Sequence, residues 1–153
     1  MKVVSSIAVP EIKISFQPKI KASERVTIDS SKSSVNLLRQ QFEMSTFEIR
    51  EEMKLVVLNR SGKALGIFTL AVGGVSHCPV DPKLVFLVTL KTPGADSLIL
   101  AHNHPSGSRN PSPNDKLVAQ KIKAGALLLG LKLWDFIILT PESYYSFSDE
   151  GCL

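Results

Sequence analysis

The 153-residue sequence predicts one layered α/β (α+β) domain, in which helices flank a mixed β-sheet. Its length is close to that of one typical domain. Its 44% hydrophobic and 21% charged residues match ordinary globular proteins and exclude a disordered chain. Along the chain, short apolar runs typical of strands alternate with segments whose apolar residues recur at helical spacing.

The N-terminal part of the sequence precedes this alternating pattern. Residues 1–22 predict an arm or an edge strand, because Pro10 and Pro18 cannot donate backbone hydrogen bonds in a central strand. A helix is expected over 30–43, where apolar residues recur at spacings of three and four behind a cluster of serines that can cap it.

The middle of the chain predicts three strands and a helix. Strand-like runs over 47–59 and 64–72 are separated by a turn-rich connection typical of a hairpin. A helix is expected from Pro82, a residue that the first helical position tolerates, to a point before Pro93. The short apolar run 97–101 predicts a strand buried on both faces.

The last third of the chain predicts one more helix and two strands. The helix is expected over 113–129 and ends at Gly130. Strands are expected over 131–139 and 144–148. Strands that alternate with helices in this way favour a sheet containing both parallel and antiparallel pairs.

Composition limits the classes of function. Two cysteines are too few for a disulfide framework, a four-cysteine zinc site or an iron–sulfur cluster, so a metal site must use histidine and carboxylate. No run approaches the length of a membrane span and no secretory leader is evident, so we expect a cytoplasmic protein without membrane contact. The net charge of +4 is spread along the chain, which favours ordinary solubility over a nucleic-acid surface.

The stretch AHNHPSGSRNPSPND, from Ala101 to Asp115, concentrates residues with metal chemistry. His102 and His104 lie two apart at the end of a buried strand, so both imidazoles should project to the same side. Asp115, in the first turn of the next helix, can be brought back as an oxygen ligand. Two histidines and one carboxylate leave a fourth tetrahedral position open, as in catalytic zinc sites.

Asp115 also has a purely structural interpretation. Ser112-x-x-Asp115 is a capping box, with Ser112 as the N-cap and Asp115 at the third helical position. Capping does not explain the two histidines just upstream. The two roles are compatible, because one carboxylate oxygen can face each way.

The string H-x-H-P-x6-S-x-x-D, here His102, His104, Pro105, Ser112 and Asp115, resembles the motif of the JAMM (MPN-plus, JAB domain) zinc metallopeptidases. Its form LAHNHPSG, together with EEMKLVVLNRSGKALGIFTLAVGG and YYSFSDEG, is similar to RadC-type proteins in particular. The resemblance covers about 23–153 and implies a JAB/MPN domain there, with a deaminase-like sheet flanked by helices.

The resemblance also implies a site and a reaction. Zn²⁺ would be held by His102, His104 and Asp115, and a glutamate on an earlier strand would act as general base in cleaving an amide bond of a peptide or isopeptide. Glu51 and Glu52 are the candidates, and strand alternation places them on opposite faces. The RadC-like pattern favours Glu51, which leaves Glu52 as an exposed carboxylate at the start of a strand.

Further features bear on the site. Ser112 matches a family serine that would donate a hydrogen bond to the oxyanion. RadC-like sequences usually have a histidine where this chain has Phe136, which keeps open an inactive zinc-binding scaffold. His77 and Cys78 are spare potential ligands, with a structural role favoured.

A second alternative for the function of the chain is a DNA-repair or mobile-element module that binds or processes nucleic acid.

Overall fold

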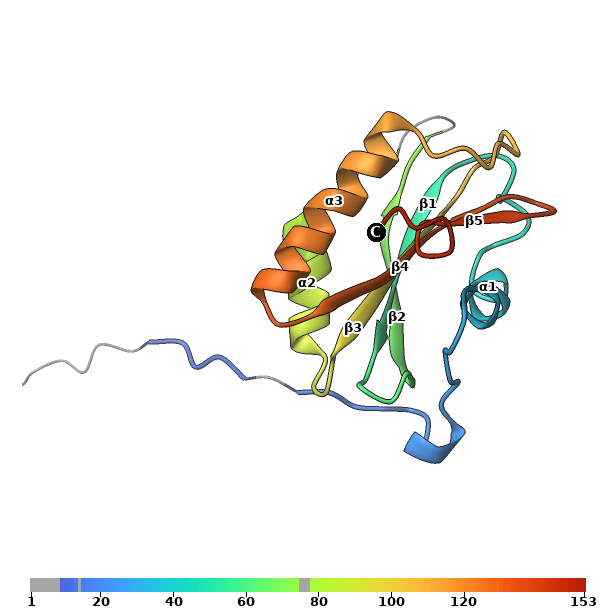
Figure 1. Cartoon of the computed structure of the whole chain (residues 1–153). Helices are drawn as coiled ribbons and strands as arrows, with labels where there is room; N and C mark the ends of the chain where they lie inside the picture. The colour runs from blue at the N-terminus through green and yellow to red at the C-terminus, as the bar shows by residue number, and fades with distance from the viewer. Residues whose placement is uncertain (1–8, 14, 75–77) are drawn as a thin grey trace, which may run out of the picture.

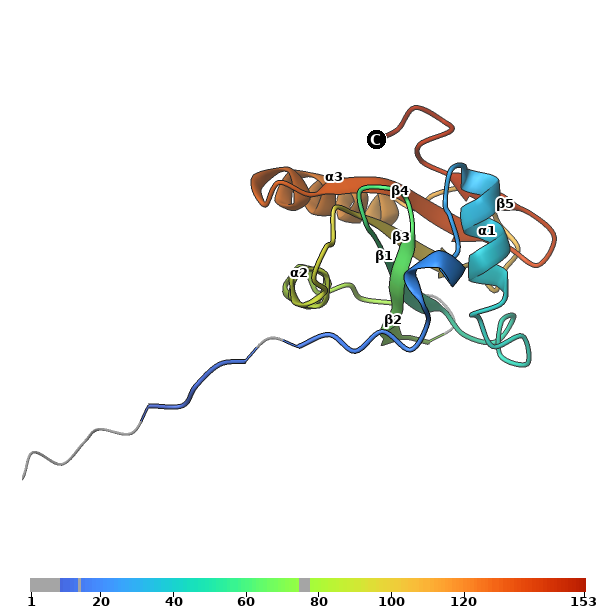
Figure 2. The ribbon, with the colours of Figure 1, turned by 90° about the horizontal axis from the view of Figure 1, so that it is seen from below.

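The computed structural model describes residues 9–13, 15–74 and 78–153 and confirms the layered fold. A five-stranded sheet of order β2-β1-β3-β4-β5 separates α1 on one face from α2 and α3 on the other (Figures 1 and 2). The elements along the chain are η1 (Ala22–Glu24), α1 (Ser31–Arg39), β1 (Glu52–Leu58), β2 (Ala64–Val72), α2 (Pro82–Lys91), β3 (Ser97–Asn103), α3 (Pro113–Leu128), β4 (Lys132–Leu139) and β5 (Tyr144–Ser146).

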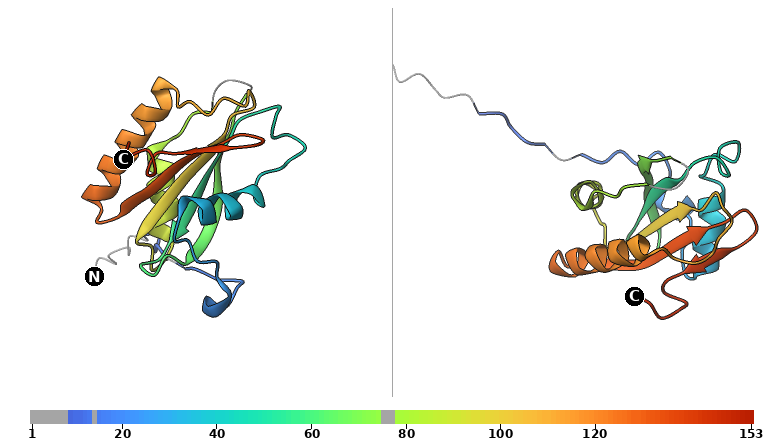
Figure 3. Two further views of the ribbon diagram at one scale, coloured as in Figure 1. Left: turned by 45° about the vertical axis from the view of Figure 1, so that its right-hand side comes forward. Right: turned by 90° about the horizontal axis from the view of Figure 1, so that it is seen from above.

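The sheet is mixed, as the sequence predicts. β1 pairs antiparallel with β2 and β3, β3 pairs parallel with β4 through the crossover helix α3, and β4 pairs antiparallel with β5. β1 and β3 are buried along their whole length, because helices cover both faces of the sheet (Figure 3).

Alternation along β1 and β3 sorts their side chains between two hydrophobic clusters. Met53, Leu55 and Val57 of β1 and Leu98 and Leu100 of β3 face the layer of α2 and α3. The side chains between them, such as Val56 and Ile99, pack toward α1 instead. Any residue of either strand is therefore assigned to one face by its position in the sequence.

The segment between α1 and β1 differs from the prediction. α1 ends at Arg39, and the strand expected from residue 47 begins only at Glu52. The residues between them form hydrogen-bonded turns, including a bond from the amide of Arg50 to the carbonyl of Thr46. Phe47 is nevertheless buried in the cluster under α1. The prediction of a strand at Phe47 is therefore wrong, because this apolar residue is buried from a turn.

The described residues 9–13 and 15–21 contain neither helix nor strand. Residues 9–13 run away from the domain (Figure 1), whereas residues 16–20 lie against it and line a pocket together with residues of β1 and β2. Nearer the domain, one isolated bridge joins Thr27 to Lys63, and the amide of Ala64 bonds to the carbonyl of Val26. None of the helices in the described ranges is both long and apolar enough to cross a membrane.

Candidate metal centre

Three side chains with metal-ligating atoms meet where β3 ends and α3 begins. Nε2 of His102 lies 3.2 Å from Oδ1 of Asp115, and Nε2 of His104 lies 3.6 Å from Oδ2 of the same carboxylate. All three residues are buried, and one potential ligand atom from each lies within 4.8 Å of the others. The described residues contain no other group of three or more such side chains as close together.

The two histidines owe their placement to β3. His102 occupies the same face as Leu98 and Leu100, and His104 extends that face just beyond the strand, where its amide bonds to the carbonyl of Leu139. Their ring centroids are 4.6 Å apart. The imidazoles therefore project to the same side, as H-x-H spacing on an extended backbone requires.

His104 is oriented by a backbone carbonyl. Its Nδ1 lies 2.7 Å from the carbonyl oxygen of Ser108, an atom that can only accept, so Nδ1 carries the hydrogen. In the neutral ring Nε2 then keeps its lone pair, which points to Asp115. Burial alone would lower the pKa of His104, but Asp115, the Ser108 carbonyl and the charge of Glu51 outweigh burial and raise it.

His102 provides the clearest indication of a ligand. Its Nε2 is fully buried and has no hydrogen-bond partner among the described residues, although Asp115 is close. A buried nitrogen without a partner costs free energy, and an ion between the three side chains would remove that cost. Two imidazole nitrogens and a carboxylate oxygen also suit a divalent transition metal. The residues present therefore fit a metal ion.

Asp115 combines capping with its place beside the histidines. The amide of Ser112 donates to Oδ2 of Asp115 at 2.6 Å, and the amide of Asp115 donates to the hydroxyl of Ser112 at 3.1 Å. Oδ1 faces His102. Burial would raise the pKa of Asp115, but the two imidazoles and the Ser112 amide outweigh burial and hold it well below the usual range. The carboxylate is ionised and ready to bind a cation.

The three side chains line a pocket of about 550 Å³ that is open to solvent. Ser112 and Glu51 also line it, so this pocket brings together the three expected metal ligands, the favoured general base and the expected oxyanion donor. The remaining lining residues are Cys78, Pro105, Ser106, Ser108, Asn110, Pro113 and Asn114.

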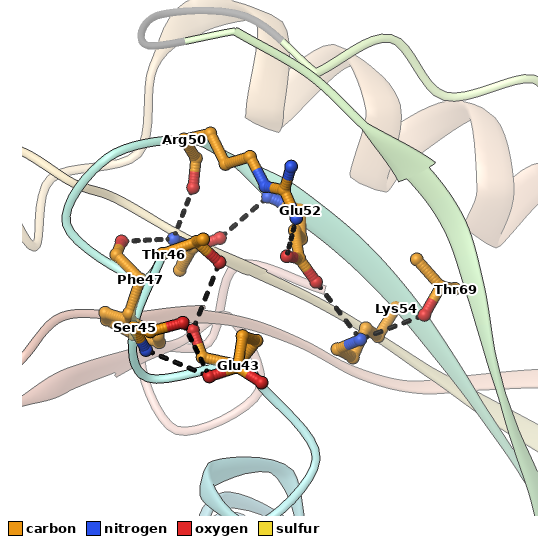
Figure 4. A network of polar contacts seen from close by, with 9 residues as sticks. Glu43, Ser45, Thr46, Phe47, Arg50, Glu52, Lys54 and Thr69 are labelled. Atoms are coloured by element: carbon orange, nitrogen blue, oxygen red, sulfur yellow. Dashed lines mark hydrogen bonds and ion pairs between the residues drawn. The ribbon is translucent and has the colours of Figure 1, made fainter.

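Glu52 points to the other face of the sheet and is not the exposed carboxylate that the sequence suggested. It is buried, 3.3 Å from Nζ of Lys54 and 3.5 Å from an amino group of Arg50 (Figure 4). Lys54 also donates to Thr69 and lies over the ring of Phe42. This paired environment explains how two charged side chains are tolerated inside the fold.

Cys78 lines the pocket but lies outside the group of three potential ligands. Burial, reinforced by the charge of Glu51, raises the pKa of its thiol, which keeps the sulfur protonated and a poor ligand. His77, the other spare ligand suggested by the sequence, lies outside the described residues.

Phe136 packs against the candidate site from inside the domain. It is completely buried, its ring centroid is 5.4 Å from that of His102, and it stacks on Phe147. An aromatic ring here supports the His102 imidazole by packing alone, without the hydrogen bond that a histidine could offer.

Asn103, which the sequence analysis overlooked, stands between the two histidines and faces away from them. Its side chain is completely buried and makes three hydrogen bonds to the backbone around Glu51. The available signal was an amide side chain at the end of a strand expected to be buried on both faces, because burial of an amide requires partners.

Replacing Ser112 by alanine should lower the free energy of unfolding of the metal-free protein by about 1 kcal/mol, because the amide of Asp115 loses its acceptor. Urea denaturation measures this loss. Ser112→Thr keeps the hydroxyl and should recover most of the stability. Equal losses in the two variants would show that the capping bond contributes little.

Comparison with known proteins identifies the family to which this chain is similar. The family model of the RadC-like JAB domain matches residues 28–152. The chain is 46% identical over 101 residues to a UPF0758 protein of Flavobacterium johnsoniae, covering 66% of this chain and 44% of that protein. It is 31% identical over 152 residues to a UPF0758 protein of Clostridium acetobutylicum, covering 99% of this chain and 64% of that protein. The chain thus spans about half the length of the curated relatives it matches.

Proposed function

Because this chain belongs to the RadC-like JAB domain family, we propose that it is a zinc-dependent hydrolase that cleaves an amide bond of a peptide or isopeptide. One observation carries the proposal: the buried, unpartnered Nε2 of His102 faces His104 and Asp115 in a pocket that a further carboxylate also lines. Catalytic metal sites combine a small ligand set with such a carboxylate.

His102, His104 and Asp115 would hold the ion. A divalent ion held there would supply Lewis acidity, which would polarise a carbonyl oxygen and make water a stronger nucleophile near neutral pH. The protein contributes rigid orientation: Ser108 holds the ring of His104, and the Ser112 amide holds the carboxylate of Asp115.

Glu51 is proposed as the general base. Its carboxylate takes a proton from the attacking water and later delivers it to the amine that leaves, so one group serves both halves of the reaction. Glu51 is half-buried at the pocket wall, where it can receive a proton without being a ligand itself. Glu52 is held on the opposite face of the sheet by Lys54 and cannot take this role.

Ser112 is proposed to stabilise the oxyanion of the tetrahedral intermediate. Capping uses only a lone pair of its hydroxyl oxygen, which accepts from the amide of Asp115. The hydroxyl hydrogen donates to no acceptor in the described residues and is free to point into the pocket. Capping and oxyanion stabilisation therefore do not compete for the same part of the hydroxyl group.

A library containing linear peptides and peptides with lysine isopeptide bonds tests the proposal. The chain is stripped of metal with a chelator, divided, and half is reloaded with zinc; mass spectrometry then detects new termini or freed lysine amines. We expect cleavage by the zinc-loaded half alone. Equal cleavage by both halves would contradict metal dependence. Stoichiometric zinc without any cleavage would favour the inactive scaffold that the packing of Phe136 on His102 also permits.

A further inference from the structure

We infer that Asn103, the residue between the two histidines, is the positioning residue that aims Glu51 into the pocket. The inference rests on the proposed function of Glu51 as general base. Three consecutive residues alternate between the two faces of the sheet. His102 and His104 face the pocket, whereas Asn103 faces the α1 side.

The bonds of Asn103 surround Glu51. Nδ2 of Asn103 donates to the carbonyl of Arg50 at 2.9 Å, and Oδ1 accepts from the amide of Glu52 at 2.7 Å. These two atoms belong to the two peptide groups on either side of Glu51. Nδ2 also donates to the carbonyl of Phe47 at 2.6 Å, which anchors the preceding turn.

The other polar atoms of these two peptide groups are bonded to the two glycines that follow β2. The amide of Glu51 donates to the carbonyl of Gly74 at 3.0 Å, and its carbonyl accepts from the amide of Gly73 at 2.8 Å. All four donors and acceptors that flank Glu51 are therefore satisfied, two by Asn103 and two by the Gly73–Gly74 backbone. With both peptide planes held, the backbone fixes the direction in which the Cα–Cβ bond of Glu51 leaves the chain.

This arrangement links the general base to the metal ligands through one side chain. Glu51 directly precedes β1, where Gly73 and Gly74 bond its own amide and carbonyl and Asn103 bonds the adjoining groups of Arg50 and Glu52. Asn103 hydrogen-bonds β3 to the backbone on both sides of Glu51. The strand that carries the histidines therefore also positions the residue that carries the carboxylate. Misplacing a reacting group by about 1 Å can cost about 100-fold in rate, so such a link matters for turnover.

Amide hydrogen exchange followed by NMR tests the link without reference to activity. In Asn103→Ala the amide of Glu52 loses its acceptor, and we expect its exchange to be about tenfold faster or more, with bound zinc unchanged. Asn103→Asp keeps the acceptor but cannot donate to Arg50 or Phe47, so the amide of Glu52 should stay slower than in the alanine variant. Unchanged exchange in both variants would overturn the inference.

Turnover of the library peptide that the chain cleaves fastest gives the second readout. Asn103→Ala should lower turnover by about 10–100-fold, but should cause no further loss in a chain that already carries Glu51→Gln. Asn59→Ala is the matched control, because Asn59 bonds the backbone of the hairpin at the far end of β1. It should leave both turnover and exchange at Glu51 and Glu52 unchanged.

The outcomes separate this inference from the function on which it rests. If Asn103→Ala lowers turnover equally with and without Glu51→Gln, or if the loss of zinc matches the loss of turnover, the positioning role is overturned while the hydrolase stays intact. If no peptide is cleaved, the proposed function fails. The exchange rates then still decide whether Asn103 holds the backbone around Glu51.

Discussion

Glu51→Gln should lower turnover by about 10²–10⁴-fold while leaving the metal content unchanged. The substitution keeps the size of the side chain but removes the carboxylate that would take the proton from water. Glu51 lines the pocket without belonging to the group of three potential ligands, so no ligand is lost. Steady-state hydrolysis and elemental analysis of the same sample measure the two effects together.

Glu52→Gln is the matched control for this prediction. It makes the same chemical change at the next residue, but on the face of the sheet where Glu52 pairs with Lys54. Stability should fall, because the buried ammonium group of Lys54 loses its opposite charge, whereas turnover should stay close to that of the unchanged chain. A loss of turnover as large as that of Glu51→Gln would show that the wrong glutamate has been assigned.

Asp135→Ala should lower the free energy of unfolding by about 3 kcal/mol, the largest loss of stability expected for a polar residue of β4. The Asp135 carboxylate is completely buried and accepts hydrogen bonds from the amides of Phe136 and Ser148 and from the hydroxyl of Ser146. Two of these donors are themselves buried and would lose their partner. Urea denaturation of the metal-free variant measures the loss.

Asp135→Asn should lose far less, because its oxygen can accept both amides and its nitrogen can donate to Ser146. The difference in stability between the unchanged chain and Asp135→Asn should also depend on pH. Burial raises the pKa of Asp135 in the folded state above its value of 3.8 in the unfolded state. The folded protein then holds the proton more tightly, so the stability of the unchanged chain relative to Asp135→Asn should fall as the pH rises above 3.8. A difference that is constant with pH would contradict this.

The parts of the candidate site that the sequence predicted correctly depend on the spacing of residues within a single strand or helix. H-x-H on an extended strand places His102 and His104 on one face, and S-x-x-D at a helix start brings Ser112 and Asp115 together. The same alternation separated Glu51 from Glu52. These relations need only the backbone period of one element, which a sequence displays directly.

The features that were missed depend on partners distant in the chain. Burial of Glu52 requires Lys54, whose ammonium group contacts Thr69 on β2 and the ring of Phe42. The role of Asn103 requires a segment 51 to 56 residues away. Phe47 was assigned to a strand because its burial, achieved from a turn under α1, looks the same in the sequence. Each of these features depends on tertiary contacts, which the spacing of residues within one helix or strand does not reveal.

Metal analysis of the chain and of two ligand variants tests the central claim most directly. Purified protein with zinc supplied and then dialysed should contain about one metal ion per chain, and Cys78→Ser should contain the same. His104→Ala and Asp115→Ala should each retain much less, because each removes one of the three side chains that meet at the end of β3. Stoichiometric metal in both ligand variants would contradict the proposed centre and the hydrolase built on it.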